Sequence, residues 1–250
     1  MIATLNNEFI KVFKGSKRFK AFLIILLMMS MISTIIIKVS KGNLTVDDVI
    51  VSNMIMSLEI LPIYIAILSS DMITDDYRNG TLKMTILQPI SRGEIIIGKA
   101  LFLIIFTTLL MTFNIIFTTF FSGFILGGMP HSKELFMFLI KGFLTSIILG
   151  AFGMVTIFIS LIMNSSGAAT GAGIGALFAI RITSVTMATY KILPSAFSGV
   201  FITNIFDLFL RERGNIPFEK FIISMIFTGA YYLCFYILAK KTFEMKEIIY

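Results

Sequence analysis

The residues with the most recognisable chemical spacing are Gly93, Gly98 and Lys99, which fit the pattern G-x-x-x-x-G-K of a phosphate-binding loop. In that motif the next residue is Ser or Thr, whose hydroxyl holds Mg²⁺, whereas this chain has Ala100. No strand is predicted before the segment, and an apolar helix is predicted after it. We therefore predict neither a nucleotide site nor a catalytic residue here.

Residues that bind metals are scarce. The chain has one cysteine, Cys234, which lies inside an apolar run, and one histidine, His131, which lies in a loop beside glycine and proline. A single cysteine excludes a disulfide within the chain and makes a thiolate metal site unexpected. We expect His131 to be solvated, and we predict no metal site.

Two charges lie deep within long apolar runs. Glu59 follows about ten residues of a predicted membrane helix, which is near mid-depth at ~1.5 Å per residue. Arg181 lies in the second half of another predicted helix, and Asn114 is a weaker polar candidate in a third. Ionisable groups in membrane helices are costly and usually face a cavity or a partner. We interpret all three as pathway candidates; the alternative for the two charges is a position near an interface, within reach of water.

A charged stretch, residues 71–99, separates two long apolar runs and holds 8 of the 35 charged residues. In so apolar a chain, such a stretch must lie in water or against another protein. Residues 81–88 can form two helical turns with Leu82 and Ile86 on one side and Lys83 on another. We predict a short amphipathic helix that lies across the membrane surface.

Local signals delimit this short helix. Asn79-Gly80 indicates a turn before it, and Pro89 ends it, because proline disfavours helix in the preceding residue. Ser91 and Glu94 then form a capping-box pattern, which predicts the start of a second helix. A solvated loop is the alternative, but a turn, an amphipathic helix, a stop and a cap within thirty residues favour docking of a partner.

The same residues resemble the cytoplasmic segment of permease subunits of ABC-2 type transporters, an exporter class also called type V. In that family an acidic residue and Tyr-Arg-Asn-Gly-Thr end transmembrane helix two, and Pro-x-Ser-Arg with a downstream Lys opens helix three. The family usually has Glu at the position of Asp76. The matching residues are Asp76, Tyr77, Arg78, Asn79, Gly80, Thr81, Pro89, Ser91, Arg92 and Lys99.

The resemblance implies a coupling helix, which fits a groove on a separate ATPase subunit and transmits its movement to helices two and three. It also implies a second permease subunit, in a homodimer or heterodimer, and export of a peptide or another amphipathic molecule. This chain would then carry no cofactor, because ATP and magnesium belong to the partner subunit. The predicted docking residues are Asp76, Tyr77, Arg78, Asn79, Gly80, Thr81, Leu82, Ile86, Pro89, Ser91 and Arg92.

Composition indicates which elements must position these residues. Hydrophobic residues make up 57% of the 250-residue chain and charged residues 14%, against roughly 25% in soluble domains. Mean hydropathy is +0.94. A membrane-spanning helix needs about 20 mostly apolar residues. We predict an all-α integral membrane protein, a single permease domain over residues 1–250, whose six transmembrane helices cover about 21–37, 49–72, 100–122, 135–163, 168–189 and 221–239.

Three further segments complete the prediction. Residues 1–20 are amphipathic and end in a cluster of basic residues, which is typical of a helix lying in the membrane interface; a cleaved signal peptide is the alternative. Residues 73–92 form the cytoplasmic coupling segment. Residues 190–219 are apolar but broken by Pro, Ser and Gly, which predicts short extracellular re-entrant helices.

In helix five, Gly167, Gly171 and Gly175 recur every fourth residue and predict close approach of another helix.

Lysine and arginine counts favour one orientation. With six spans, the side that holds both termini carries twelve such residues and the other side eight. We therefore expect a multi-pass protein of a bacterial plasma membrane with both termini cytoplasmic, in contact with membrane lipids and not with nucleic acid. The alternative function is a secondary transporter or channel-like protein driven by an ion gradient, but that class should show several intramembrane acids or paired broken helices.

Overall fold

The computed structural model describes residues 2–15, 17–39, 45–78, 91–163, 165–192, 200–206, 208–211 and 216–245. All regular secondary structure in these ranges is helical, which confirms the all-α prediction. The helices are α1 (Ile2–Gly15), α2 (Lys17–Val39), α3 (Val46–Arg78), α5 (Arg92–Leu126), α6 (Ser132–Ile162), α7 (Ser166–Thr189), α8 (Ile202–Ile205), α9 (Leu208–Arg211) and α10 (Phe218–Met245).

Among the described residues, six helices are long and apolar enough to cross a membrane: α2, α3, α5, α6, α7 and α10. This number agrees with the prediction, and most of the helices extend beyond the predicted ends. Helix α5 continues past Ser122 to Leu126, because Gly123 stays helical and the left-handed Gly127 (φ 78°) ends the helix. Helix α3 runs through Pro62 to Arg78 and so includes charged residues beyond its apolar part.

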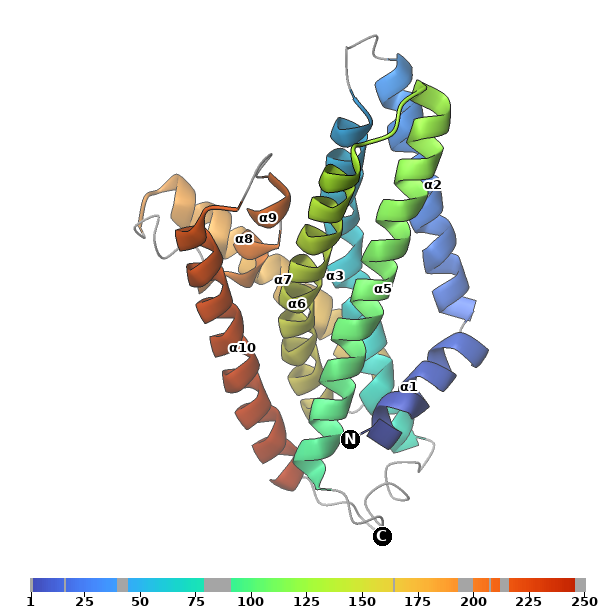
Figure 1. The fold of residues 1–250 in the computed structure, drawn as a ribbon. Coiled ribbons are helices and arrows are strands. Elements are labelled where there is room, and N and C mark those ends of the chain that lie inside the picture. Colours follow the sequence, from blue (N-terminus) through green and yellow to red (C-terminus); the bar gives the residue numbers. More distant parts are fainter. Residues whose placement is uncertain are drawn as a thin grey trace.

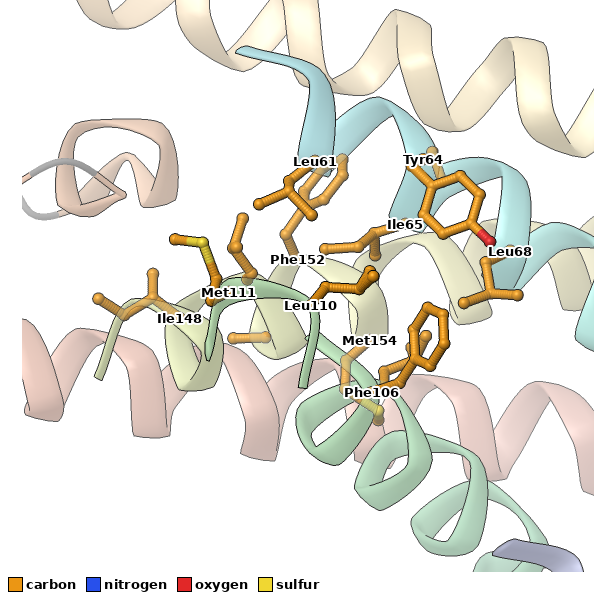
Figure 2. Packing of buried hydrophobic residues seen from close by; sticks show 14 of the residues in the cluster. Leu61, Tyr64, Ile65, Leu68, Phe106, Leu110, Met111, Ile148, Phe152 and Met154 are labelled. Carbon is orange, nitrogen blue, oxygen red and sulfur yellow. The ribbon is translucent and has the colours of Figure 1, made fainter. Parts of the chain in front are cut away.

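The core of the bundle lies between α3, α5 and α6 (Figure 1). Figure 2 shows side chains of these three helices packed together, among them Leu61 and Ile65 of α3, Phe106 of α5 and Phe152 of α6. All four are at most 1% exposed. Helix α6 is the most buried span, with 78% of its most apolar window inside the protein, against 11% for α10. Helix α10 therefore lies at the periphery.

Helix α1 lies at one end of the bundle, at an angle to the spanning helices, against α5 and close to the end of α3 (Figure 1). We refer to this as the α1 end. The one-turn helix α8 packs against α7 and also touches α6 and α10, whereas α9 packs against α6 and α3. Ile202 and Ile205 of α8 and Phe209 of α9 are buried. That α1 is interfacial and that residues 190–219 are re-entrant remain predictions.

The predicted coupling helix lies outside the described residues. This concerns residues 79–90, which include Asn79, Gly80, Thr81, Leu82, Ile86 and Pro89. The helices on both sides of this segment are described, so the structure shows where its two ends are held.

Candidate functional site

The most buried charged residue beside the predicted docking segment is Lys99 of α5, which is 0% exposed. Its Nζ donates to Glu8 Oε1 of α1 at 2.6 Å, to Asp76 Oδ2 of α3 at 2.6 Å and to the Met72 carbonyl at 2.7 Å. Glu8 is 1% exposed and Asp76 8%. One ammonium group therefore joins three helices.

Lys11 of α1 completes the cluster. Its Nζ donates to Asp76 Oδ1 at 2.6 Å and to Glu8 Oε1 at 3.2 Å. Burial acts to lower the pKa of Lys11, but the two carboxylates outweigh it, and the pKa lies above its ordinary value. The charge cluster, which we define as Glu8, Lys11, Asp76 and Lys99, holds two positive and two negative groups and is neutral overall. Removing one member would leave a buried charge uncompensated, which is strongly destabilising.

Aromatic packing holds α1 in the position that the cluster needs. The ring of Phe9 meets the edge of Phe102 of α5 at a centroid distance of 4.9 Å, and Phe13 meets Phe106 at 6.3 Å. Val12 is 5% exposed. The apolar face of α1 is thus divided: Val12 packs inward, whereas Ile2, Ile10 and Phe13 are more than half exposed.

The second helix of the segment begins as predicted. The Ser91 side chain accepts from the Glu94 N–H at 3.2 Å, and the Glu94 carboxylate accepts from the Ser91 N–H at 3.1 Å, so the capping box is confirmed. Arg92, which follows the cap, does not point away from the protein. Its guanidinium donates to the carbonyls of Phe243 and Glu244 (the latter at 3.1 Å) and lies 5.4 Å from the centroid of the Phe243 ring.

Other predicted docking residues line the surface next to the cluster. Arg78 pairs with Asp75 at 2.9 Å, three residues earlier in α3. Tyr77 and Arg78 border a cavity of about 470 Å³ whose other wall is the turn between α6 and α7, with Met163, Ser165 and Ser166. The end of α3 and this turn therefore form one continuous surface at the α1 end.

A second polar contact at this end involves Asp71, for which the sequence predicted no role. The Asp71 carboxylate accepts from the Ser166 hydroxyl of α7 at 2.6 Å and from the guanidinium of Arg18 in α2. The Ser70 hydroxyl also donates to the Ser166 carbonyl at 3.0 Å. Helix α3 is thereby attached to α2 and to the first turn of α7.

The structure brings the two deep charges together. Arg181 of α7 donates through Nη2 to Glu59 Oε1 of α3 at 2.6 Å and through Nη1 to Oε2, a two-point ion pair. The two side chains are about half exposed, at 49% and 53%. They line a cavity of about 60 Å³ with Pro62, Leu177 and Phe206, and Thr203 of α8 also borders it. Half-exposed charges at this depth imply that this α3–α7 face meets water or protein.

Asn114 does not join this pair. It is 2% exposed and lies between α3 and α5, where its amide donates to Ser57 Oγ at 2.7 Å and its carbonyl accepts from Asn53 at 3.1 Å. Thr118 extends the network, because its hydroxyl accepts from Ser30 of α2 at 2.9 Å. Asn114 therefore links α3 and α5, and the network that it forms with Asn53 and Thr118 reaches α2.

The glycines of α7 have two different surroundings. A Cβ at Gly167, Gly171 or Gly175 would meet no described atom within 4 Å. In the described part of the chain, no helix packs against these three residues. Gly173, which the sequence did not single out, is the packed glycine: its Cβ would lie 3.3 Å from Ala66 of α3 and 3.2 Å from Thr156 of α6.

The structure shows that the residues with phosphate-loop spacing do not form a phosphate-binding loop. Gly93, Gly98 and Lys99 lie inside the continuous helix α5, and the Lys99 amine is bonded to Glu8, Asp76 and Met72. A phosphate loop needs a non-helical backbone whose N–H groups face the ligand, so these residues do not form one. Across the residues that the structure describes, no group of three His, Cys, Asp or Glu side chains could hold a metal ion.

Sequence reasoning missed Glu8, Lys11, Asn53 and Asp71. For Glu8 and Lys11, the sequence shows an acid and a base three residues apart on an amphipathic helix, a pattern that usually indicates an exposed pair. Their burial depends on α5 lying against α1, and the sequence does not show this.

A family model described as "ABC-2 family transporter protein" matches residues 4–182 of this chain. The match extends from α1 into α7 and includes the charge cluster, Glu59 and Arg181; it ends before α8, α9 and α10. Comparison with curated proteins gave no match.

Proposed function

Because this chain belongs to the ABC-2 transporter family, we propose that it is the permease subunit of an ATP-driven exporter of the type V class whose ATPase is a separate protein. ATP and Mg²⁺ would bind to that partner. The observation that carries the proposal is the arrangement at the α1 end. There, the helices on both sides of residues 79–90 extend beyond their apolar parts and are fixed by charged contacts.

The docking proposal assigns residues 73–92 to the ATPase interface, with Leu82 and Ile86 on the contact face. In this proposal the α1 end is cytoplasmic and lies in a bacterial plasma membrane, and α1 lies in its interface. The exposed lysines Lys14, Lys17 and Lys20 fit contact with anionic lipid heads. Asp76 and Arg92 are bonded within the chain, so we assign them to positioning of the segment.

The transport pathway is proposed along the α3–α7 face. One six-helix chain supplies half of such a pathway, and a second permease subunit, identical or related, would complete it. Two features support this face: the half-exposed Glu59–Arg181 pair and the open glycine face of α7. A peptide or other amphipathic molecule fits a surface that carries one neutral ion pair among apolar groups such as Ile55, Leu58 and Leu177.

The test replaces Leu82 and Ile86 with Asp in tagged permease expressed in its own host. Burying an unpaired carboxylate in a docking face costs several kcal/mol, so ATPase activity should no longer co-purify with the double variant. Lys83→Ala, on the other predicted side of the same helix, is the matched control and should keep it. If the double variant retains ATPase activity, the docking assignment is wrong, and the gradient-driven carrier becomes the better explanation.

A further inference from the structure

Within the predicted docking segment, residues 79–90 connect the end of α3 at Arg78 to Ser91, which caps α5. The segment connects α3 to α5, so its movement should reach those two helices directly. Each end of the segment is also bonded to a helix other than α3 and α5. That helix is α1 at one end and α10 at the other, the first and the last helices of the described chain.

At the outgoing end, the bonded helix is α1. Asp76, two residues before the end of α3, shares Lys99 with Glu8 and also binds Lys11. Charge-assisted hydrogen bonds of about 2.6 Å are the strong kind. Pulling α1 away from α3 and α5 would break the Lys99–Glu8 and Lys11–Asp76 bonds and leave Lys99 and Asp76 with one charged partner fewer each, so α1 is held to this end.

At the returning end, the bonded helix is α10. Arg92 donates to the carbonyls of Phe243 and Glu244 in the last turn of α10, which ends at Met245. A helix C-terminus carries partial negative charge on its free carbonyls, and a cation there is stabilising. Helix α10 also packs along α6, where the Tyr232 hydroxyl donates to the Ile147 carbonyl at 2.9 Å, although only 11% of its most apolar window is buried. Arg92 bonds its last turn to the start of α5.

We infer that Lys99 and Arg92 are positioning residues that transmit movement of the docking segment to α1 and α10, respectively. The inference rests on the proposed function, since it needs an ATPase that moves the segment. It assigns a mechanical role to two helices that the segment does not connect. Figure 1 shows the geometric basis: α1 and the end of α10 lie on different sides of the start of α5.

The experiment measures ATP-driven distance changes by spin labelling of the purified permease–ATPase complex, with and without ATP and Mg²⁺. In a Cys234→Ser background, one label pair joins Asn7→Cys of α1 to Ile162→Cys at the end of α6. A second pair joins Ile237→Cys of α10 to the same reference. All three positions are exposed, and α6 is the most buried span and thus a suitable reference.

The inference predicts a separation of effects. Glu8→Gln and Lys99→Met should abolish the ATP-dependent change at α1 and keep the change at α10, whereas Arg92→Gln should do the reverse. Arg92→Lys should keep both changes, because lysine also binds carbonyls at a helix C-terminus. Glu219→Gln and Lys241→Met remove the same kinds of group at exposed positions and should alter neither change.

Three results would overturn the inference: no ATP-dependent change at α1 or α10 in the unsubstituted complex, both changes kept in every variant, or release of the ATPase by Arg92→Gln. The last result would place Arg92 in the docking contact. If no ATPase co-purifies with the unsubstituted chain, the proposed function itself fails, and this is evident before any label is attached. The double variant Glu8→Gln with Lys99→Met keeps the test open if the single variants do not fold, because it leaves Lys11 and Asp76 in charge balance.

Discussion

The buried charges at the α1 end are stabilised as members of a group. Lys99 is fully buried, and an ammonium in that position requires a carboxylate, which Glu8 and Asp76 supply from two other helices. Lys11 balances the second carboxylate. The same rule applies to Glu59 and Arg181, which meet across α3 and α7. At the residue scale, therefore, the unit to test is the pair or cluster.

The charge cluster predicts non-additive stability. Lys99→Met should lower the free energy of unfolding by about 3–5 kcal/mol, because two carboxylates then share only Lys11. Adding Glu8→Gln restores charge balance, so the double variant should be more stable than the sum of the single effects implies. Thermal unfolding of the three variants in detergent measures this coupling. Additivity within about 0.5 kcal/mol would show that Glu8 and Lys99 do not depend on each other.

The Glu59–Arg181 pair predicts a functional defect without loss of insertion. Glu59→Gln replaces a carboxylate with an amide that is cheaper to bury, so the level in the membrane should be unchanged. Transport, or the ATPase rate of the complex, should fall, by about tenfold if the lost differential stabilisation is near 1.4 kcal/mol. Full activity of well-folded Glu59→Gln would show that the Glu59–Arg181 pair is not part of the transport pathway.

An exchanged pair serves as the control. Glu59→Arg with Arg181→Glu keeps one positive and one negative group between α3 and α7. If the pair only holds the helices together, the exchange should restore activity; if each charge faces the pathway, activity should stay low while stability recovers. The two readouts separate a structural role from a pathway role.

At the scale of elements, α7 has one face that packs inside the chain and one that does not. Gly173 lies between α3 and α6, whereas Gly171 and Gly175 face open space. The G-x-x-x-G spacing predicted close approach of another helix, and within the described chain the approach occurs at Gly173 instead. In the proposed function, this open face is where a second permease subunit would pack.

Leucine substitutions should distinguish the two faces. Gly173→Leu overpacks the contact with Ala66 and Thr156 and should cost about 1–3 kcal/mol of stability or more. Gly171→Leu and Gly175→Leu should leave the unfolding temperature of the isolated subunit unchanged and weaken association of permease subunits. Unfolding temperature and cross-linked oligomer are the two measurements. Unaltered association in the variants at Gly171 and Gly175 would argue against this face as the interface.

At the scale of the whole molecule, α1, the end of α3, the start of α5 and the end of α10 share one end of the bundle (Figure 1). The ends of α2 and α5 and the starts of α3 and α6 lie at the opposite end. The basic residues of the α1 end predict that it is cytoplasmic, since lysine and arginine are retained on that side.

Labelling with a membrane-impermeant maleimide in intact cells tests this orientation. In a Cys234→Ser background, Ser132→Cys, at the exposed start of α6, should react from outside. Asn7→Cys, exposed on α1, should react only after the membrane is permeabilised. The opposite pattern would invert the topology and place the docking segment where no ATPase could reach it.

The sequence by itself determined the membrane class, the six spans and the capping box at Ser91, because these depend on apolar length and on local hydrogen bonds. It also identified Glu59 and Arg181 as charges that need a partner, since a charge in an apolar run is costly wherever the helix packs.

Only the tertiary structure decided which groups meet. Glu8 and Lys99 are 91 residues apart, and Glu59 and Arg181 are 122 apart. Such contacts are set by helix packing, and no local pattern encodes them. For the same reason the spacing of glycines in α7 did not reveal that Gly173 faces inward and Gly171 outward. The sequence predicted Arg92 as a docking residue and did not show that it bonds to the last turn of α10, because that contact depends on packing of two distant helix ends.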